Sequence, residues 1–405
     1  MRIPGEDETL EKERLVHYNH GAGTGLFRVI VWFSLTMDRF DCVIVGAGPG
    51  GATFARKSAL KGLKTLLIEK ESFPRKKVCG GGLTPAIGGL FDFDHQETIE
   101  RVTRGITFLS RDETQDCTWH PDGMAVQMVS RRNFDHFLVR QAVDAGAVLA
   151  EGTKVISVKE STNNVTVLTD KGDEIAAPIV IGADGAQSVV AAGAGLYRGR
   201  GGVAIEAEVY PRDRDALDEH GDRAIFGFGF IPKGYGWVFP KKDHFSVGIG
   251  TAYGRLPGLV SLYHRFKTRF DFLKDADEGD RRGWFLPYCT SSGSMNTPRI
   301  CLIGDSAHLV DPFSGEGIYY AVQSATIAAE TVFEELEAKG RLSQRYTKEV
   351  TRRIAKDYSY ARWCFDIFYA SPSFFYTKNK VIRALTRLSN KETRYRDIFK
   401  ELRRK

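Results

Sequence analysis

Four glycines within residues 46–51 could bind a phosphate. Gly46 would permit a tight turn, Gly48 would let a pyrophosphate approach the backbone, and Gly51 would let a helix pack closely on a strand. The N-terminus of such a helix offers unpaired N–H groups and a partial positive charge. We therefore predict that this segment, including Gly50, holds the pyrophosphate of a dinucleotide.

An acidic residue ends the next predicted strand. Residues 42–45 and 65–68 are predicted strands with a helix over 52–60 between them, which makes a βαβ unit. Glu69 is placed to accept hydrogen bonds from a ribose hydroxyl, and we add Lys70 beside it to the predicted site. A carboxylate at this point disfavours a 2′-phosphate, so NADP is not expected here.

Two more acidic turns follow predicted strands later in the chain. Asp184-Gly185 comes after the strand at 179–181, and Gly304-Asp305 comes at the end of the strand at 300–303. An NAD site needs no such second turn, whereas the ribityl chain and isoalloxazine of a flavin extend beyond the first βαβ unit and need further partners. Asp305 is placed to accept hydrogen bonds from ribityl hydroxyls.

A glycine-rich segment leads into a helix predicted over 317–336. Its N-terminus could stabilise negative charge at N1 and O2 of a reduced flavin. The predicted flavin contacts here are Pro312, Gly315, Gly317 and Ile318.

These motifs, in this order, resemble the FAD-dependent oxidoreductases of the para-hydroxybenzoate hydroxylase fold over about residues 38–340. The resemblance implies FAD as the cofactor and places Arg131 near its pyrophosphate. It also implies an α/β fold, in which a Rossmann-like FAD-binding domain carries an inserted antiparallel β-sheet substrate domain and a C-terminal helical region.

Three further segments resemble the geranylgeranyl reductase branch of that superfamily. Residues 73–82 are similar to its Pro-Arg-x-Lys-x-Cys-Gly-Gly segment, residues 235–240 to its YxWxFP motif, and residues 311–320 to its GEGIYYA helix start. The resemblance implies a reductase that saturates C=C bonds of a geranylgeranyl or other polyprenyl chain, carried by a lipid, a chlorophyll precursor or a quinone. It implies catalytic roles for Cys79, Tyr235 and Trp237.

Some residues depart from related patterns. Val78 stands where many relatives have proline, Ala191 where aromatic hydroxylases carry arginine, and Tyr319 where they carry asparagine. Tyr235 stands where flavin halogenases have a tryptophan. These departures count against a hydroxylase or halogenase, but an FAD monooxygenase of an apolar or aromatic substrate and a non-catalytic flavin-binding protein stay as alternatives.

The aromatic residues of the YxWxFP segment alternate along a predicted strand, so they would face one side. Such a stripe is typical of an ordinary core, and it could equally form the wall of a substrate tunnel. The predicted substrate contacts are Tyr235, Trp237, Phe239 and Pro240. We expect space for an apolar tail beside them from four glycines, Gly227, Gly229, Gly234 and Gly236. Cys79, in a glycine-rich loop, is either a small packing residue or a group that gates or protonates the substrate.

Composition narrows the class of protein. An apolar content of 42% with 27% charged residues excludes a mainly disordered chain. The six cysteines show no CxxC pair and no zinc spacing with histidine, so no metal site is predicted and a reducing cytoplasm is the expected setting. No apolar run reaches the roughly 18 residues that a membrane span needs.

Both ends of the chain are distinctive. Residues 1–37 are predicted to be an N-terminal extension that is not native, with Met37 as the natural start and an interfacial segment as the alternative. Residues 378–405 carry 11 Lys and Arg against three acidic residues, and aromatic residues between 363 and 376 precede them. This composition predicts either a solvated helical subdomain or peripheral contact with an anionic membrane; nucleic acid is not an expected partner.

The predicted domains follow from these segments. The FAD-binding domain comprises residues 38–95, 125–200 and 295–342, the substrate domain residues 96–124 and 201–294, and a basic helical region residues 343–405. No second GxGxxG is present for a separate nicotinamide domain. The expected electron donor is therefore either transiently bound NAD(P)H or a ferredoxin-like carrier.

Overall fold

The computed structural model describes residues 16–17, 39–110, 117–119, 125–196, 201–213, 215–288, 293–370, 384, 387–388 and 390–403. Most of the predicted N-terminal extension lies outside the described residues. So do Phe374, Phe375 and Tyr376, together with most of residues 378–389.

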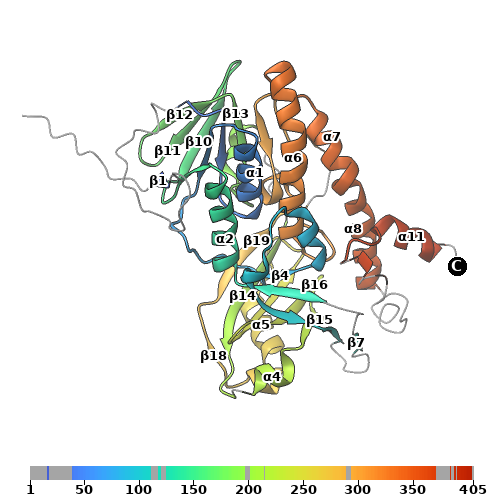
Figure 1. Cartoon of the computed structure of the whole chain (residues 1–405). Coiled ribbons are helices and arrows are strands. Elements are labelled where there is room, and N and C mark those ends of the chain that lie inside the picture. Colours follow the sequence, from blue (N-terminus) through green and yellow to red (C-terminus); the bar gives the residue numbers. More distant parts are fainter. Residues whose placement is uncertain are drawn as a thin grey trace, which may run out of the picture.

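A six-stranded sheet in the order β1-β9-β3-β2-β13-β20 forms the centre of the FAD-type fold (Figure 1). Its strands are β1 (Val16–His17), β2 (Cys42–Val45), β3 (Thr65–Ile68), β9 (Val148–Ala150), β13 (Ile179–Gly182) and β20 (Ile300–Leu302). All pairs are parallel except that of β1 with β9. The five parallel strands of this sheet, β9, β3, β2, β13 and β20, are buried along their length. This burial on both faces explains their largely continuous apolar sequences.

Three helices pack together on this sheet, with α1 (Pro49–Leu60) in contact with α2 (Arg131–Asp144) and α6 (Ile318–Lys339). Figure 1 shows them side by side. The predicted βαβ unit is confirmed, but α1 begins inside the glycine cluster, earlier than the predicted 52–60. Gly48 is its N-cap and Pro49 its first residue, a position where the missing N–H of proline costs nothing.

A larger sheet carries the predicted substrate domain, in the order β18-β14-β17-β16-β15-β6-β7, with β19 also paired to β14. Its strands are β6 (Gly105–Ser110), β7 (Cys117–Trp119), β14 (Gly202–Tyr210), β15 (Arg223–Ile231), β16 (Gly234–Pro240), β17 (Phe245–Thr251), β18 (Asp277–Glu278) and β19 (Arg282–Leu286). The antiparallel pairing predicted for 202–252 is confirmed. β6 joins β15 in parallel, which the sequence did not indicate.

Two three-stranded sheets complete the β structure. One contains β10 (Val155–Glu160), β11 (Val165–Thr169) and β12 (Glu174–Ala177). The other contains β4 (Gly82–Leu83), β8 (Val126–Val129) and β5 (Ile99–Thr103), and it joins segments assigned to different domains from the sequence. Shorter helices are α3 (Val189–Gly193), α4 (Ala216–His220) and α5 (Leu259–Lys267), with 3-10 turns at Pro85–Leu90, Gln96–Thr98, Asp271–Leu273 and Gly304–Ala307.

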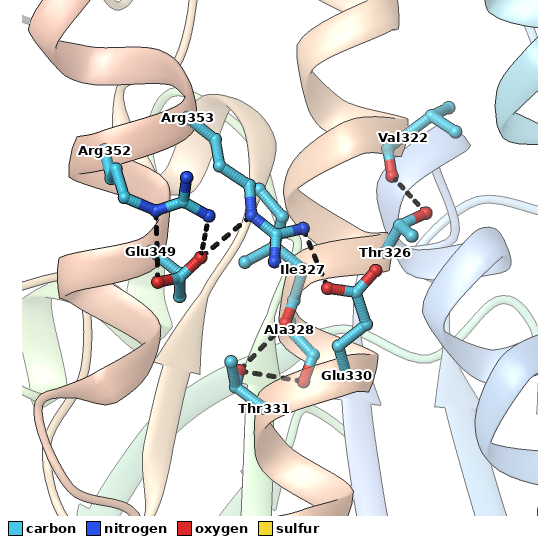
Figure 2. Close-up of polar contacts among 9 residues, drawn as sticks. All are labelled: Val322, Thr326, Ile327, Ala328, Glu330, Thr331, Glu349, Arg352 and Arg353. Carbon is cyan, nitrogen blue, oxygen red and sulfur yellow. Dashed lines mark hydrogen bonds and ion pairs between the residues drawn. The ribbon is translucent and has the colours of Figure 1, made fainter.

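The C-terminal helices are α7 (Arg345–Val350), a π-helical turn (Thr351–Ala355), α8 (Lys356–Ala370) and α11 (Tyr395–Arg403). They begin beside α6, against which α7 packs, and end with α11, which packs against α8 (Figure 1). Figure 2 shows Arg353 between Glu349 at 2.9 Å and Glu330 of α6 at 2.8 Å, while Thr326 and Thr331 bond backbone carbonyls within α6. These ion pairs are exposed and contribute little to stability.

A buried hydrogen bond connects α7 to the six-stranded sheet. The hydroxyl of Tyr346, which is fully buried, donates to the carbonyl of Leu302 in β20 at 2.6 Å.

Among the described residues, no helix combines the length and the apolar character needed to cross a bilayer.

Candidate active site

A cavity of about 1050 Å³ brings the sequence motifs together between the six-stranded and the larger sheet. Its lining includes nearly all the predicted site residues: Gly46, Gly48, Gly50, Glu69, Lys70, Cys79, Arg131, Asp184, Gly185, Tyr235, Trp237, Phe239, Gly304, Asp305, Pro312, Gly315, Gly317 and Ile318. Gly51 and Pro240 are not part of the lining. A Cβ on Gly51 would lie 1.9 Å from the carbonyl oxygen of Gly46, so this glycine serves helix packing.

The glycine loop is crowded on one side and open on the other. Gly46 has a φ of +98°, and a Cβ there would lie 2.4 Å from the carbonyl oxygen of Ala183. A Cβ on Gly48 would meet no heavy atom within 4 Å, and Gly48 lines the cavity. The space above Gly48 is therefore a cradle beside a helix N-terminus, as a pyrophosphate requires.

Glu69 is buried and already organises the loop. Its Oε2 accepts from the backbone N–H of Ala47 at 3.0 Å, and its Oε1 accepts from that of Glu71 at 3.2 Å. Arg75 lies 3.4 Å from Oε2. A hydrogen bond from a ribose hydroxyl to Glu69 stays a prediction.

Two carboxylates face the cavity in different surroundings. Asp184 accepts from the Ser188 hydroxyl at 2.5 Å and from the backbone N–H of Val190 at 3.1 Å, so it caps the start of α3. Burial raises the pKa of Asp305, while the nearby cations Lys77 and Arg131 act in the opposite direction. Asp305 is half-buried and lines the cavity, so its carboxylate suits hydroxyl donors such as those of a ribityl chain.

Three cationic side chains, those of Arg75, Lys77 and Arg131, are part of the cavity lining. Arg131 holds Asp135 with two hydrogen bonds of 2.7 and 2.9 Å, and Arg75 reaches the same carboxylate at 3.0 Å. Among the described residues, neither the Nε of Arg75 nor the Nζ of Lys77 has a hydrogen-bond partner, although both atoms are buried. The Nζ of Lys77 lies over the ring of Trp284. Buried donors without a hydrogen-bond partner in the lining of this cavity fit the phosphate and carbonyl oxygens of FAD.

Lys77 gives the stability of the apoprotein a testable pH dependence. Burial, with Arg131 nearby, lowers the pKa of Lys77 from 10.5 to about 7. Between these values the unfolded chain binds one more proton than the folded chain, so this group makes stability rise with pH, by at most about 1.4 kcal/mol per unit. We expect Lys77→Met to remove this slope, so that the gain in stability of the FAD-free variant over the FAD-free wild type is larger at pH 7 than at pH 10. Urea unfolding at both pH values would measure it, with the exposed Lys76→Met as control; equal slopes in the wild type and Lys77→Met would contradict the prediction.

The aromatic residues of β16 share one face of the strand, as predicted. The rings of Tyr235 and Trp237 are 6.2 Å apart, and Phe226 of β15 lies 5.8 Å from Tyr235 and 5.2 Å from Phe239. The Tyr235 hydroxyl donates to the carbonyl of Ser314 at 2.5 Å, and burial raises the pKa of Tyr235. The aromatic wall is therefore joined directly to the loop that precedes α6.

Of the four glycines predicted to leave space beside this wall, Gly234 lines the cavity, whereas Gly227, Gly229 and Gly236 do not. Gly227 and Gly236 lie on the opposite face, where an added Cβ would be 2.4 and 2.5 Å from the ring of Phe266. An added Cβ on Gly248 would lie 2.1 Å from the indole of Trp237. The prediction was wrong for Gly227 and Gly236, because residues on either side of Tyr235 and Trp237 in a strand point away from the ring face.

Aromatic residues of α8 also line the cavity, which the sequence did not indicate. Phe365 and Phe368 are 5% and 4% exposed, and the ring of Phe368 lies 4.7 Å from that of Phe228. The Tyr369 hydroxyl donates to the carbonyl of Gly234 at 2.6 Å. The described part of the aromatic cluster therefore packs in the protein, in agreement with the predicted alternative of a C-terminal helical subdomain.

The segment that contains α11 closes the cavity beside the start of α6. Lys391 lines the cavity and pairs with Glu316 at 2.5 Å. The hydroxyl of Tyr395 donates to Asp311 at 3.0 Å, and the backbone N–H of Tyr395 donates to Asp357 of α8. The C-terminal region thus contributes to the wall of the site.

Comparisons with known proteins agree with this geometry. The chain matches the FAD binding domain family over residues 39–220 and 291–358. It is 30% identical to a digeranylgeranylglycerophospholipid reductase of Methanocaldococcus jannaschii over 331 residues, covering 80% of this chain and 84% of that protein. It is also 30% identical to a geranylgeranyl diphosphate reductase of Rhodobacter capsulatus over 311 residues, covering 74% of this chain and 76% of that one.

The chain belongs to the geranylgeranyl reductase family of FAD-dependent oxidoreductases. A solved member of similar fold is a geranylgeranyl bacteriochlorophyll reductase-like protein of Thermoplasma acidophilum, with a TM-score of 0.73 and 26% identity over 82% of this chain and 88% of that one. The family and the fit of the cavity agree on FAD as the cofactor. The fold is the predicted one, with an FAD-binding core, a β-sheet insertion and C-terminal helices.

Proposed function

We propose that the protein reduces isolated C=C bonds of a geranylgeranyl or other polyprenyl chain. The observation that carries the proposal is a single cavity that runs from the glycine cradle to an apolar wall of aromatic side chains. The names of the family members support the same substrate class, with the prenyl chain on a phospholipid in one and on a diphosphate in the other.

The protein itself would hold the alkene in position and exclude water from the site. Bound FAD, once reduced, supplies the hydride for the reaction. An isolated alkene has no carbonyl to polarise, so a catalytic triad would have nothing to act on. Trp237, Phe239 and Phe226 would hold the alkene at reacting distance and exclude water, which can lower the barrier by several kcal/mol.

Among the cysteines whose side chains the structure describes, Cys79 is the best placed to supply or control the proton. It is half-buried, lines the cavity and accepts from the backbone N–H of Gly81 at 3.4 Å. Burial raises the pKa of Cys42 to about 11 and that of Cys364 to about 12, and neither lines the cavity. We assign Cys79 to the reacting end of the site on this basis.

We expect Cys79→Ala to slow single-turnover alkene reduction by roughly 100- to 10,000-fold, with normal FAD content, because a positioned proton donor contributes on that scale. Cys79→Ser should retain more activity than Cys79→Ala, since its hydroxyl can still hold a proton. Cys364→Ser is the matched control for loss of a thiol outside the cavity. Unchanged rates in both Cys79 variants would make Cys79 a packing residue.

Anaerobic turnover tests the function itself. The purified protein would be reduced with dithionite and given geranylgeranyl diphosphate or a digeranylgeranyl phospholipid, and products would be analysed by mass spectrometry. Products heavier by two hydrogens per double bond support the proposal. A product that appears only with oxygen and contains a hydroxyl would indicate a monooxygenase instead, and no product from either substrate would indicate flavin binding without turnover.

The electron donor would be found by the same approach. We propose NAD(P)H bound transiently or a ferredoxin-like carrier as the source of electrons. Stopped-flow bleaching of the flavin absorbance with NADH, NADPH or reduced ferredoxin would identify it. If dithionite bleaches the flavin but NADH, NADPH and reduced ferredoxin do not, none of these three is the electron donor.

We also propose that the basic C-terminal segment contacts an anionic membrane, from which a prenyl lipid would be collected. Each Lys or Arg near such a surface contributes about 1 kcal/mol, and salt screens the attraction. We expect binding to vesicles that contain phosphatidylglycerol, and weaker binding as salt rises. Lys391 and Tyr395 line the cavity, so a change to the whole segment would also alter the site. The variant for this test therefore replaces only Arg403, Arg404 and Lys405 with glutamine. Sedimentation with anionic and neutral vesicles measures it, and equal binding to both would contradict the proposal.

A further inference from the structure

We propose that Lys241 is a positioning residue whose side chain clamps the Cys79–Gly82 loop against the aromatic strand β16. The proposal rests on the proposed function, because it concerns how Cys79 meets a substrate held by Trp237 and Phe239. Lys241 does not line the cavity. It would act through the loop.

The side chain of Lys241 ends on three backbone carbonyls. Its Nζ donates to Gly80 at 2.6 Å, to Gly81 at 3.1 Å and to Val129 of β8 at 2.9 Å. An ammonium group has three hydrogens and no acceptor, so each hydrogen has one carbonyl. Two of the three carbonyls belong to the loop that follows Cys79.

The backbone of Lys241 is fixed as firmly as its amine. Lys241 is 3% exposed and follows Pro240, the last residue of β16. Its N–H donates to the carbonyl of His244 at 2.7 Å, and its carbonyl accepts from the Nε of Arg101 at 3.0 Å. The clamp therefore starts from a rigid point on the strand that carries Trp237 and Phe239.

The loop is shaped to receive this amine. Gly81 has a φ of +63°, and a Cβ there would lie 2.3 Å from the carbonyl oxygen of Val129 and 2.7 Å from the Nζ of Lys241. A Cβ on Gly80 would lie 3.0 Å from the Nε1 of Trp237 and 3.0 Å from the ring of Phe239. The loop is thus pressed between the amine and the aromatic wall, with no space for a larger residue.

The three carbonyls are the hydrogen-bond partners of the Lys241 amine, and the charged groups around it act from further away. Among the described residues, no carboxylate forms an ion pair with its Nζ; Glu100, Glu206 and Glu208 act on it from further away, as does Cys79. Burial lowers the pKa of Lys241 to about 8, so the amine keeps its three hydrogens at pH 7. Glu206 is fixed by the Ser246 hydroxyl at 2.9 Å, and that hydroxyl also accepts from the Nε1 of Trp237 at 3.2 Å.

The test measures loop position separately from turnover. Lys241→Met keeps the length of the side chain but removes all three donors, Lys241→Arg keeps charge and donors, and Lys242→Met is the matched control at the exposed neighbouring position. Alkylation of Cys79 by iodoacetamide, followed by peptide mass spectrometry, reports how the loop holds the thiol. FAD content, kcat and KM for a prenyl substrate are measured on the same preparations.

We expect Lys241→Met to change the alkylation rate of Cys79 at least about fivefold and to lower kcat about 10- to 100-fold, with FAD content kept and KM little changed. Lys241→Arg should recover part of kcat, and Lys242→Met should match the wild type. If Lys241→Met does not fold, Lys241→Gln, a shorter side chain with two N–H groups, should show the same changes in smaller degree.

Wild-type alkylation and wild-type kcat in Lys241→Met or Lys241→Gln would overturn the proposal. A large rise in KM with unchanged kcat would also overturn it, since it would indicate a role in substrate binding. If the wild type reduces no prenyl substrate, the proposed function fails, while the alkylation rates still decide whether the clamp exists.

Discussion

Gly48→Val is expected to lower the affinity for FAD at least about 100-fold while the protein still folds. The valine side chain would project from Gly48 into the cavity, where a Cβ meets no protein atom within 4 Å. It therefore takes the space of the pyrophosphate without straining the fold, and it also blocks the N–H groups at the start of α1. The measurement is the ratio of flavin to protein absorbance after purification, followed by titration of the apoprotein with FAD.

Gly89→Val is the matched control, because a Cβ on Gly89 also meets nothing within 4 Å and Gly89 is outside the cavity. Circular dichroism and thermal unfolding of the apoproteins should not separate the two variants. Asp305→Ala should weaken FAD binding by a smaller factor, since it removes one acceptor and leaves the cradle intact. Full FAD occupancy in Gly48→Val would show that the cofactor lies elsewhere.

Trp237→Ala is expected to lower kcat/KM for a prenyl substrate about 100-fold with little change in FAD content. Trp237 is buried in the cavity wall, where its indole packs on Gly248 and its Nε1 donates to Ser246 at 3.2 Å. Removing the ring opens the wall to water and leaves the alkene poorly held. Because a buried Trp→Ala change also costs about 3–5 kcal/mol of stability, the assay must be run well below the variant's melting temperature.

Two further variants separate the possible causes. Trp237→Phe keeps an aromatic wall but loses the Nε1 hydrogen bond, so it should keep most of the activity if the wall is what matters. Trp363→Ala removes a partly buried tryptophan outside the cavity lining and should leave kcat/KM near the wild-type value. A Trp237→Ala enzyme that turns over at the wild-type rate would remove Trp237 from the substrate site.

The cofactor end of the site could be predicted from the sequence because its signals are local. A strand, a glycine turn, a helix and an acidic residue within residues 42–69 specify one βαβ unit, and the structure contains it. The error over Gly227 and Gly236 was also local. Gly236 alternates with Tyr235 and Trp237 and pairs with Gly227 across the strands, so both glycines had to lie on the other face.

The remaining walls depend on contacts between distant parts of the chain. Phe368 meets Phe228 and Phe313 only after α8 docks. Aromatic density before a basic tail predicts burial in protein and contact with lipid about equally well, and only the docked helix decides between them. Lys241 has no recognisable signal either, because its three carbonyl partners lie more than 100 residues away in sequence.

The strand order of the six-stranded sheet also bears on biosynthesis. β2 is made well before β13, its partner on one side, and before β20, which pairs with β13; Tyr395 follows later still. Translation at about 5–20 residues per second therefore leaves the phosphate loop without much of its sheet and cavity for many seconds. Flavin capture must consequently wait until β20 and the segment that contains Tyr395 have been made.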